Sequence, residues 1–545
     1  MSAASPYDTL VQELYIAYFG RPVDYFGLQN FDVALANAQA PTDATNLAWE
    51  YDLNPPVHSL IYGFDTSSES VALYGSGSTQ DFINAIYQDL FNRPAALTGL
   101  VFWSEAIDSG RLSKGLAALA ILAGAQQNTS AQGLIDQQTI ANKVAVAENF
   151  TLALGGSSND IVAYYGAAAA ADTRSMLSTV DSTTIPANFN IQTTLQNIVG
   201  NAPFGHYAMT SAPEGVVGGI GNNIFTAVLD NAAGLSAGGQ VQTLVTGDSI
   251  VGGGISNALN LTDFGIGGVM TIPSGVTIDG VAIWNISSLE AVSGDFSNWS
   301  GLSLLNVNDS TGNDAIVAGD GMIVNVSDKA GNVSVLGGSK VTVATDSAHA
   351  VTLNSSAAGF TATVGNSSNT ITDTTANAVI AIAVGTGSNN VTLGSDVQGT
   401  ISFAAHTAAD AVALGPSQSN IGVMLVIGGL NNSGSDSITF SGDANTLVGF
   451  TQVTSAEVTA SGGDPTLLDA WLRAADGAYG SGVGGAAHTV TWFVFQGNTY
   501  LLESVAGQTK DSGAIPLDVT LVELTGTGYS FTHASGAGGT LHLLG

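Results

Sequence analysis

The chain contains no cysteine in 545 residues, which excludes disulfide bonds, thiol nucleophiles and zinc–thiolate sites. Basic residues are scarce too: 10 lysines and arginines stand against 43 aspartates and glutamates, which gives a formal net charge of −33. Such a surface has almost nothing with which to neutralise phosphate groups, so we expect no nucleic-acid partner. Hydrophobic residues make up 45 % of the chain, which favours folded cores over disorder.

The sequence also lacks the segments that direct a protein to a membrane or hold it there. Residues 1–14 contain no basic region and no apolar run, so no amino-terminal secretory signal is expected. No stretch approaches the roughly 18 apolar residues of a spanning helix, so we expect no transmembrane segment. Excess carboxylate is typical of proteins that work in extracellular calcium, although it can equally keep a Gly-, Ala- and Thr-rich surface soluble. We expect an extracellular location and Ca2+ as the cofactor.

The composition changes along the chain. All but four of the ten basic residues precede residue 175, and after about residue 210 Gly, Ser, Thr, Asn, Asp and Val prevail. This change predicts an α+β multidomain chain: an all-α amino-terminal domain, a right-handed parallel β-solenoid or β-roll-like region, and a small carboxy-terminal β module. The expected boundaries are 1–205 for the helical domain, 206–300 for a glycine-rich opening segment, 301–460 for the solenoid and 461–545 for the last module.

The helical part contains an internal duplication, in which "LYIAYFGRPVDYFGLQNF" (14–31) matches "IYQDLFNRPAALTGLVFW" (86–103) at an offset of 72 residues. Each copy predicts a helix, an Arg-Pro turn and a second helix. We expect Arg21 and Arg93 to bond carbonyls or acidic side chains at the turn; a sugar or anion contact is the alternative. Both copies resemble the domain-of-unknown-function 4214 family, with its pattern LYxxYFGRPxDxxGLxxW. The first copy keeps the acidic residue of the pattern, whereas Ala96 departs from it in the second.

That resemblance implies where the protein is located more than what reaction it performs. The family occurs in bacterial surface and secreted proteins, often before calcium-binding β repeats, and "NKVAVAENFTLAL" (142–154) looks like its closing helix. Residues 1–205 are therefore expected to anchor the protein to the cell envelope, with outer-membrane lipopolysaccharide or a surface polysaccharide as the partner.

Short strands recur between about residues 310 and 415. Their first inward β-branched residues are expected to be Val333, Val351, Ile371, Val391 and Val412, spaced by 18, 20, 20 and 21. A period near 20 with Asn, Gly, Ser and Asp between strands is typical of a β-solenoid. In the same region Asn369 and Asn390 are expected to stack as a hydrogen-bonded ladder rather than bind a metal.

Two segments suggest calcium. The first is "NVNDSTGNDAIVAGDG" (306–321), where Gly and Ser let the backbone turn its carbonyls inward around four oxygen-bearing side chains. Calcium binds six to eight oxygens in loose geometry, so such a loop is a candidate site. An ordinary Asn-Asp turn is the alternative. The second, "VVGGIGNNIF" (216–225), is close to the calcium-binding repeat G-G-x-G-x-D, but Asn223 holds the Asp position.

Residues 214–263 resemble the segment that opens the crystalline half of calcium-dependent, RTX-related surface-layer proteins of Caulobacter-type bacteria. The glycine-rich near-repeat, "LDNAAGL" and "GDSIVGGGISNALNLTD" occur in the same order. Asn223 and Asn257 replace the two repeat aspartates, so any site at Asn223 should be weak or lost. The full set of candidate metal ligands is Asn223, Asp230, Asp248, Asp263, Asp309, Asn313, Asp314 and Asp320.

The tail "TWFVFQGNTYLLESVAGQTKDSGAIPLDVTLVELTG" (491–526) predicts a strand, a Gly-Asn turn, a strand, a loop and a strand. It resembles the carboxy-terminal module of proteins exported by type I secretion. The residues that carry the resemblance are Asn498, Thr499, Tyr500, Asp518, Leu524, Thr525 and Gly526. An uncleaved signal here would replace the missing amino-terminal one.

Enzymatic residues are sparse in the β region. Between residues 175 and 328 there is no Lys or Arg to serve a polysaccharide lyase, and His349, His406 and His488 show no metal-binding spacing. We therefore expect a protein that is not an enzyme. The sequence predicts a structural subunit of a bacterial surface layer, a homo-oligomer whose lattice Ca2+ holds by bridging carboxylates. The alternative is a calcium-binding adhesin or matrix protein with a β-solenoid stalk.

Overall fold

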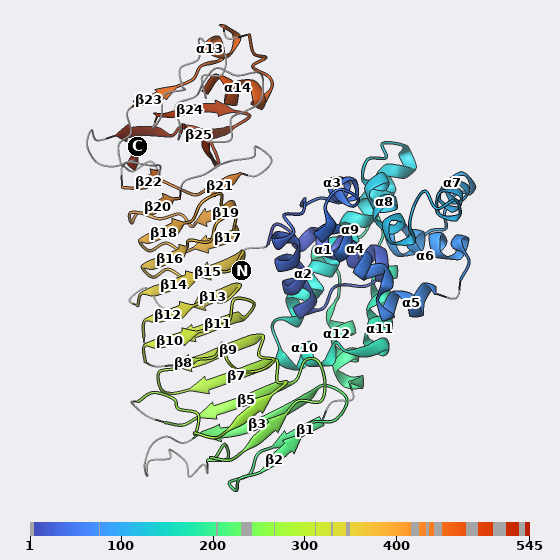
Figure 1. Ribbon diagram of the computed structural model, residues 1–545, viewed down its shortest axis with the longest axis vertical. Coiled ribbons are helices and arrows are strands. Elements are labelled where there is room, and N and C mark those ends of the chain that lie inside the picture. Colours follow the sequence, from blue (N-terminus) through green and yellow to red (C-terminus); the bar gives the residue numbers. More distant parts are fainter. Residues whose placement is uncertain are drawn as a thin grey trace.

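The computed structural model describes fifteen segments of the chain, and every structural statement below concerns these residues. They are 5–75, 77–202, 205–229, 242–265, 268–310, 312–328, 331–344, 349–415, 424–431, 435–440, 449–460, 462–475, 489–504, 519–533 and 540–544. The expected fold class is confirmed: helices come first, a parallel β-solenoid follows, and a few strands close the chain (Figure 1).

The helical module occupies the first two hundred residues. Its helices are α1 (Asp8–Phe19), α2 (Tyr25–Asn37), α3 (Ala44–Glu50), α4 (Pro55–Thr66), α5 (Ser68–Tyr74), α6 (Thr79–Phe91), α7 (Leu97–Asp108), α8 (Lys114–Gln126), α9 (Ala131–Leu154), α10 (Ser158–Ala163), α11 (Gly166–Ser178) and α12 (Gln192–Asn201), with a 3-10 turn η1 (Pro186–Asn188). Many begin at a Ser, Asp or Asn whose side chain accepts a backbone N–H in the first turn, as Asp24 does from Gly27. Such caps satisfy donors that a helix start leaves free.

The duplicated motif folds into two helix–turn–helix units, α1–α2 and α6–α7, that make the same contacts. Arg21 forms a two-pronged ion pair with Glu69 at 2.7 and 2.6 Å and donates to the carbonyl of Pro22 at 3.0 Å. Arg93 repeats this arrangement with Asp136 and with the carbonyl of the proline that follows it. The expectation for both arginines is confirmed, and their planar guanidinium groups join each turn to a further helix.

The β region is a stack of turns whose strands form two long sheets. The first sheet contains, in spatial order, β1 (Gly205–Ala208), β3 (Asn223–Leu229), β5 (Ala258–Asp263), β7 (Ile283–Ser288), β9 (Leu304–Ser310), β11 (Ile323–Asp328), β13 (Lys340–Ala344), β15 (Gly359–Val364), β17 (Val379–Val384), β19 (Gln398–Phe403), β21 (Leu425–Gly428), β26 (Val519–Leu524), β25 (Asn498–Ser504), β24 (Thr489–Phe495) and β23 (Gly449–Gln452). Strands β7 and β9 pair with each other, so the first sheet is continuous across the expected boundary between residues 300 and 301.

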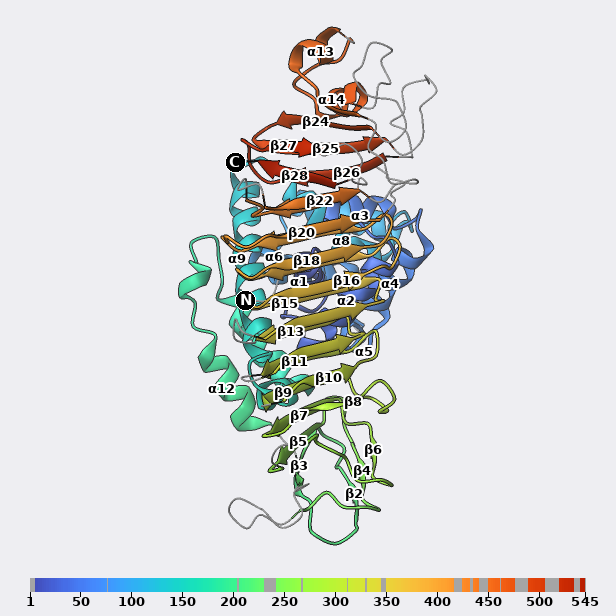
Figure 2. The ribbon, with the colours of Figure 1, turned by 90° about the vertical axis from the view of Figure 1, so that its left-hand side faces the viewer.

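The second sheet faces the first across the core. It contains β8 (Ser293–Asp295), β10 (Asp314–Val317), β12 (Val333–Leu336), β14 (Val351–Ser355), β16 (Asn369–Asp373), β18 (Asn389–Leu393), β20 (Ala411–Leu414), β22 (Ser437–Phe440), β28 (Thr540–Leu544) and β27 (Ser530–His533). A small sheet of β2 (Gly215–Val217), β4 (Ser249–Val251) and β6 (Thr277–Asp279) lies near the start of the stack. Figure 2 shows the strands of successive turns lying one above another.

Columns of buried aliphatic side chains fill the space between the two long sheets. One column in the second sheet is Val335, Leu353, Ile371, Val391 and Val412, all at most 1 % exposed. Burial of each such side chain stabilises the fold by about 1.5–3 kcal/mol. All five residues expected to point inward are buried, but they do not form one column: Val333 and Val351 pair with each other and then with Asn369 rather than with Ile371. Both positions point inward, and spacing alone does not distinguish between two columns two residues apart.

The helical module packs on the outer face of the first sheet (Figure 1). A Cβ at Gly359 of β15 would lie 3.6 Å from Ala36 of α2, so the helix rests directly on the strand. Nearby, Ile161 and Val162 form a buried cluster with Ile283 and other outward residues of the first sheet. An asparagine ladder on the same face ends at Asn325, next to Tyr25 of α2. That ladder is formed by Asn260, Asn285, Asn306 and Asn325, with successive bonds of 2.7, 2.8 and 2.8 Å.

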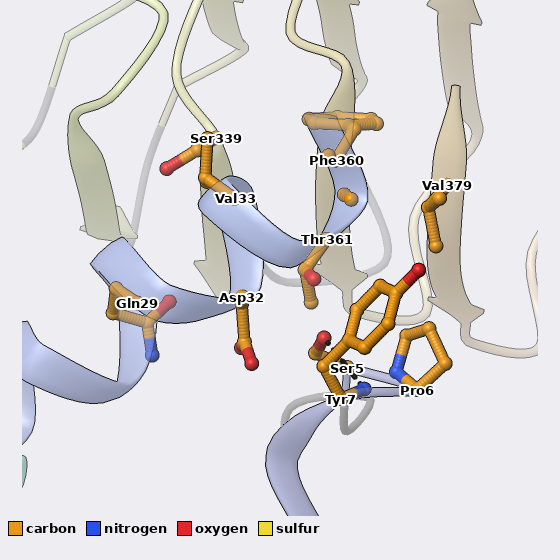
Figure 3. A pocket seen from close by; sticks show the side chains of 12 residues that line it. Ser5, Pro6, Tyr7, Gln29, Asp32, Val33, Ser339, Phe360, Thr361 and Val379 are labelled. Carbon is orange, nitrogen blue, oxygen red and sulfur yellow. Dashed lines mark hydrogen bonds between the residues drawn. The ribbon is translucent and has the colours of Figure 1, made fainter. Parts of the chain in front are cut away.

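A hollow of about 20 Å³ marks the junction between α2, residues 5–7 and strands β13 to β17 (Figure 3). This volume is close to that of one water molecule. Asp32 lines it and is 8 % exposed. Burial, and then the neighbouring carboxylate of Asp8, hold the pKa of Asp32 well above its usual range. The junction is therefore closely packed and shows no cleft for a substrate at this point.

The last strands close the far end of the solenoid. Strands β24 and β25 form an antiparallel hairpin through a two-residue turn in which Gln496 and Gly497 both have positive φ, 46° and 93°. The three expected strands and the turn between the first two are confirmed, although the turn lies one residue earlier than the Gly-Asn pair. The expected loop before the third strand lies outside the described residues. Strand β26 pairs with β21 and strand β28 with β22, so strands from residues 461–545 extend both long sheets, and β23 is the last strand of the first sheet. Such a cap covers edges that would otherwise pair with other chains. No helix in the described segments is long and apolar enough to cross a membrane.

We predict that Glu13→Gln stabilises the helical module at pH 8 and changes little at pH 5. Burial is the main cause that raises the pKa of Glu13 to about 7, although Gln126 donates to it at 2.6 Å. A raised folded-state pKa means that stability is complete below the unfolded value and is lost as pH rises through 7. At pH 8 the substitution should raise the free energy of unfolding by about 1–3 kcal/mol. Thermal unfolding of the parent and the variant across pH 5–8 measures this change. An equal stability difference between the two proteins at pH 5 and pH 8 would contradict the raised pKa of Glu13.

Candidate functional site

A ladder of polar side chains runs up the inner edge of the second sheet, at the start of successive strands. Asn369 donates from Nδ2 to Oδ1 of Asn389 at 2.6 Å, and Asn389 donates in turn to Oδ1 of Asp410 at 3.0 Å. The backbone N–H of Asp410 then donates to Oδ1 of Asp436 at 3.0 Å. All four residues are at most 1 % exposed. A ladder was expected here, but its second member is Asn389 and not Asn390, which is exposed.

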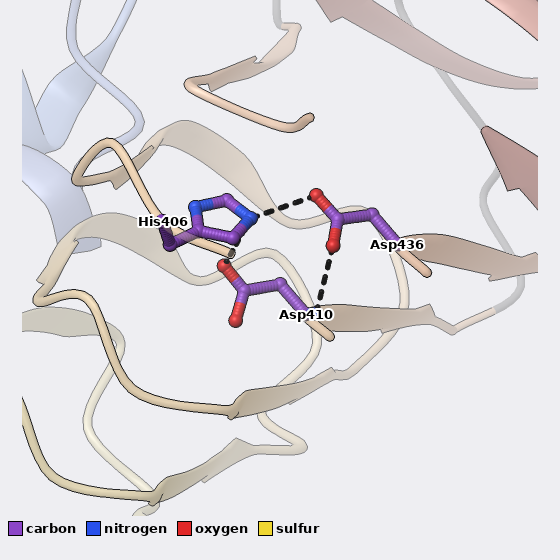
Figure 4. A group of neighbouring side chains, drawn as sticks. All are labelled: His406, Asp410 and Asp436. Carbon is purple, nitrogen blue, oxygen red and sulfur yellow. Dashed lines mark hydrogen bonds and ion pairs between the residues drawn. The ribbon is translucent and has the colours of Figure 1, made fainter. Parts of the chain in front are cut away.

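The ladder ends in two aspartates that face one histidine (Figure 4). Nε2 of His406 lies 2.9 Å from Oδ2 of Asp436 and 3.2 Å from Oδ2 of Asp410. All three side chains are fully buried. In the described part of the chain, this is the one group of at least three His, Asp or Glu side chains whose ligand atoms lie within 4.8 Å of one another.

Hydrogen bonds from outside the group fix each of its members. Nδ1 of His406 lies 2.7 Å from the carbonyl of Ala404, and a carbonyl only accepts, so Nδ1 carries a proton. The backbone N–H of Asn431 donates to Oδ2 of Asp436 at 2.6 Å. Oδ2 of Asp410 has no hydrogen-bond partner, because the single Nε2 proton of a charged imidazole is directed to Asp436. Burial raises the pKa of Asp410.

The charge balance of the group favours a cation between the three side chains. Burial alone would lower the pKa of His406, but the Ala404 carbonyl and the carboxylates of Asp436 and Asp410 raise it above its usual value. Even with His406 charged, one imidazolium faces two carboxylates, which leaves a formal charge of −1 in a buried place. Buried charges of this kind are costly unless they are paired.

Two neighbouring turns of the solenoid bring the group together, because His406 and Asp410 share the connection between β19 and β20. His406 follows β19, Asp410 immediately precedes β20, and Asp436 immediately precedes β22. In the sequence His406 shows no metal-binding spacing to another histidine, and neither aspartate was among the predicted ligands. The signal that could have found them is the column itself, because Asn369, Asn389, Asp410 and Asp436 occupy the same position one turn apart.

The predicted calcium ligands of the opening segment that the structure describes form hydrogen bonds within the chain. Asn223 donates to the carbonyls of Gly219 and Gly221 at 3.1 and 2.8 Å, and its Oδ1 accepts from the N–H of Gly219. It also donates to Oδ1 of Asn257 at 2.9 Å, so the two asparagines that replace aspartates bond to each other. With its amide oxygen and nitrogen already engaged, Asn223 does not suit an ion here.

Asp248 and Asp263 lie at the core of the same segment and are at most 1 % exposed. The two oxygens of Asp248 accept backbone N–H groups of Glu214 and Val245 at 2.9 and 2.7 Å. Asp263 accepts from the hydroxyl of Ser288 at 2.7 Å. These bonds give both carboxylates a role in folding, and a metal role for them stays a prediction.

The cluster predicted in residues 306–321 is spread over one turn of the solenoid. Asn313 accepts from the N–H of Asn332 at 2.9 Å, which links neighbouring turns. Asp314 is buried and accepts from the N–H of Val292 at 2.7 Å, whereas Asp320 accepts from the hydroxyl of Ser356 at 2.9 Å. Asp230 and the side chain of Asp309 lie outside the described residues. The described members contact different neighbours, and calcium binding by them stays a prediction.

The outer face of the second sheet has a distinct character: it carries no charge over seven strands, β10 to β22. Two outward columns run along it, and their members are Ala315, Ser334, Thr352, Thr370, Asn390, Ala411 and Ser437 in one and Val317, Leu336, Asn354, Thr372, Thr392, Ala413 and Thr439 in the other. All are exposed or half-buried. The helical module packs on the first sheet instead, and Figure 2 looks toward this uncharged face.

Comparison with known proteins identifies one part of the chain. The family described as domain of unknown function DUF4214 matches residues 61–129. Residues 61–129 form a DUF4214 domain. The match spans the second Arg-Pro unit, α6–α7, and helices α5 and α8, whereas the first unit lies before it. Among curated proteins, nothing matches the chain.

We predict that Asn389→Asp destabilises the solenoid strongly, whereas Asn390→Asp does not. The first substitution removes three donations by Nδ2, to Gly385, Gly387 and Asp410, and places a second buried carboxylate beside Asp410. The loss should be about 2–5 kcal/mol. The control places the same charge on the next residue, which is exposed, and should change stability by less than about 0.5 kcal/mol. Thermal unfolding followed by circular dichroism compares them; equal effects would contradict the ladder.

Proposed function

We propose that the chain is a structural subunit of a bacterial surface layer, a protein that works outside the cell by assembling laterally with copies of itself and that is not an enzyme. Support comes first from the architecture, a solenoid of stacked turns whose interior is filled by aliphatic columns. A rod of this kind is stable through contacts between neighbouring turns and presents long regular faces. Repeat-type structural and surface proteins are built in this way.

The uncharged outer face of the second sheet carries the proposal. Copies of a chain with a net charge of −33 repel each other, so they approach most easily where no carboxylate lies. The face extends over six strand spacings of about 4.8 Å, or roughly 30 Å. One contact of this size is weak, but a lattice repeats it many times, and repetition converts weak contacts into stable assembly.

Calcium has a defined part in this proposal. Exposed carboxylates outside the uncharged face would still repel between neighbouring copies, and a divalent cation bridging two of them removes that repulsion. We place these ions between copies, because Asn223, Asp248 and Asp263 bond within the chain. Removal of calcium should therefore loosen the assembly and leave the fold of each subunit intact.

The two ends of the chain have proposed roles as well. The helical module, which contains the DUF4214 domain, would hold the array to lipopolysaccharide or another surface polysaccharide. The carboxy-terminal strands would carry the type I secretion signal. Asn498 and Thr499 bond to Gly526 there, at 2.9 and 3.0 Å, so residues of the expected export pattern join the hairpin to the third strand. Asp518 of the same pattern lies outside the described residues.

We predict that the double substitution Thr370→Asp and Thr372→Asp weakens self-association in calcium at least about tenfold. It places two carboxylates in the middle of the uncharged face. The matched control, Thr400→Asp with Ser402→Asp, adds the same two charges at exposed positions of the first sheet. Sedimentation velocity across protein concentrations compares the two variants with the parent. If both variants associate as the parent does, the uncharged face is not the contact.

A calcium-binding adhesin or matrix protein with a solenoid stalk is the second candidate. The helical module favours it, since a polysaccharide-binding head on a rod requires no lattice. The two candidates differ in the oligomeric state in calcium: an adhesin stays monomeric and binds purified polysaccharide, and an array subunit sediments as large assemblies.

A further inference from the structure

The group of His406, Asp410 and Asp436 has features that the proposed assembly does not use. Three ligand atoms, Nε2 and two Oδ2 oxygens, converge from two neighbouring turns of the solenoid, and Nε2 lies 2.9 and 3.2 Å from the two oxygens (Figure 4). Asp410 is 0 % exposed, and its Oδ2 is directed into the group without a hydrogen-bond donor. A buried carboxylate oxygen in this position needs a cation.

We propose that His406, Asp410 and Asp436 bind one divalent transition-metal ion of the Zn2+ class through these three atoms. Zinc binds imidazole nitrogen and carboxylate oxygen at about 2.0–2.2 Å, so neighbouring ligand atoms of a tetrahedral site lie about 3.3 Å apart. The distances of 2.9 and 3.2 Å require the side chains to open by only a few tenths of an ångström. A fourth ligand would be a water molecule.

The donor set separates this ion from calcium. Calcium takes six to eight oxygens at 2.3–2.6 Å, whereas this group offers three ligating side chains, one of them through nitrogen. Imidazole suits zinc and its neighbours in the first transition row. The site is therefore independent of the calcium that the proposed assembly uses.

The surroundings hold the ligands in the orientation that a metal requires. The Nδ1–H of His406 donates to the Ala404 carbonyl at 2.7 Å, which directs Nε2 toward the carboxylates. The second oxygens of both aspartates accept protein N–H groups, from Asn389 to Asp410 and from Asp410 to Asp436, at 2.9 and 3.0 Å. Such outer hydrogen bonds to ligating His and carboxylate groups fix tautomer and orientation in metal sites.

The position of the site gives it a structural role. Asp436 precedes β22, and its backbone carbonyl accepts from the N–H of Leu543 at 3.0 Å. Leu543 belongs to β28, a strand of the carboxy-terminal cap that pairs with β22. A bound ion would join the turn after β19 to the starts of β20 and β22, next to the strand on which the cap docks. Metal binding should therefore raise the stability of the cap end of the rod.

The test uses the full chain, freed of metal by a chelator that is then removed, and titrated with Zn2+ by isothermal calorimetry. We expect one Zn2+ per chain at this site and a higher midpoint of thermal unfolding. His406→Gln and Asp410→Asn should weaken binding at least about hundredfold. The Asn side chain keeps an oxygen for the Asn389 donors, which preserves the fold. His542→Gln, at an exposed position of the neighbouring β28, is the matched control and should bind as the parent does.

Two results would overturn the proposal: no zinc binding by the parent chain, or binding that is unchanged in His406→Gln and Asp410→Asn. A Co2+ titration adds a readout that does not depend on stability, since Co2+ in a tetrahedral N/O site absorbs in the visible range and should lose this absorption in both variants. A tenfold or greater excess of Ca2+ should not displace the Zn2+. Displacement would assign the group to calcium instead and contradict the zinc assignment.

Discussion

The in-register stacking of successive turns is the constraint on which the rest of the structure depends. Because each strand pairs with the strand one turn away, side chains stack in columns. Most core columns are aliphatic, the inner ladder is asparagine and aspartate, and the outer columns are uncharged. A slip by one residue would turn each column to the wrong side. The dry interior, the His406 group and the uncharged face all follow from this single register.

The sequence predicted the architecture well because composition and periodicity report directly on helices and on repeated strands. The paired arginines, Arg21 and Arg93, were assigned to their contacts correctly, since a motif repeated within one chain implies the same local bonds twice. The ladder was placed one residue away, at Asn390 instead of Asn389, because both residues begin the same strand, β18, and only the register separates an inward from an outward side chain.

The candidate site was much harder to predict. His406 and Asp410 stand four residues apart in the connection before β20, but Asp436 comes from the next turn, and no local motif joins it to the other two. Conversely, residues that stand close together in the sequence, such as Asn313, Asp314 and Asp320, separate in the fold, because successive residues of a strand point to opposite sides. Acidic residues in a Gly- and Asn-rich sequence therefore do not by themselves identify a calcium site, and several of them here cap turns instead.

The account links a rigid rod, an uncharged contact face and a helical module on the opposite side, an arrangement that suits lateral assembly with one side left for attachment. Electron microscopy of the purified full chain, incubated with and without calcium, tests this central claim most directly. We expect a periodic two-dimensional array with calcium and dispersed subunits after chelation. Dispersed monomers at every calcium concentration would contradict the account.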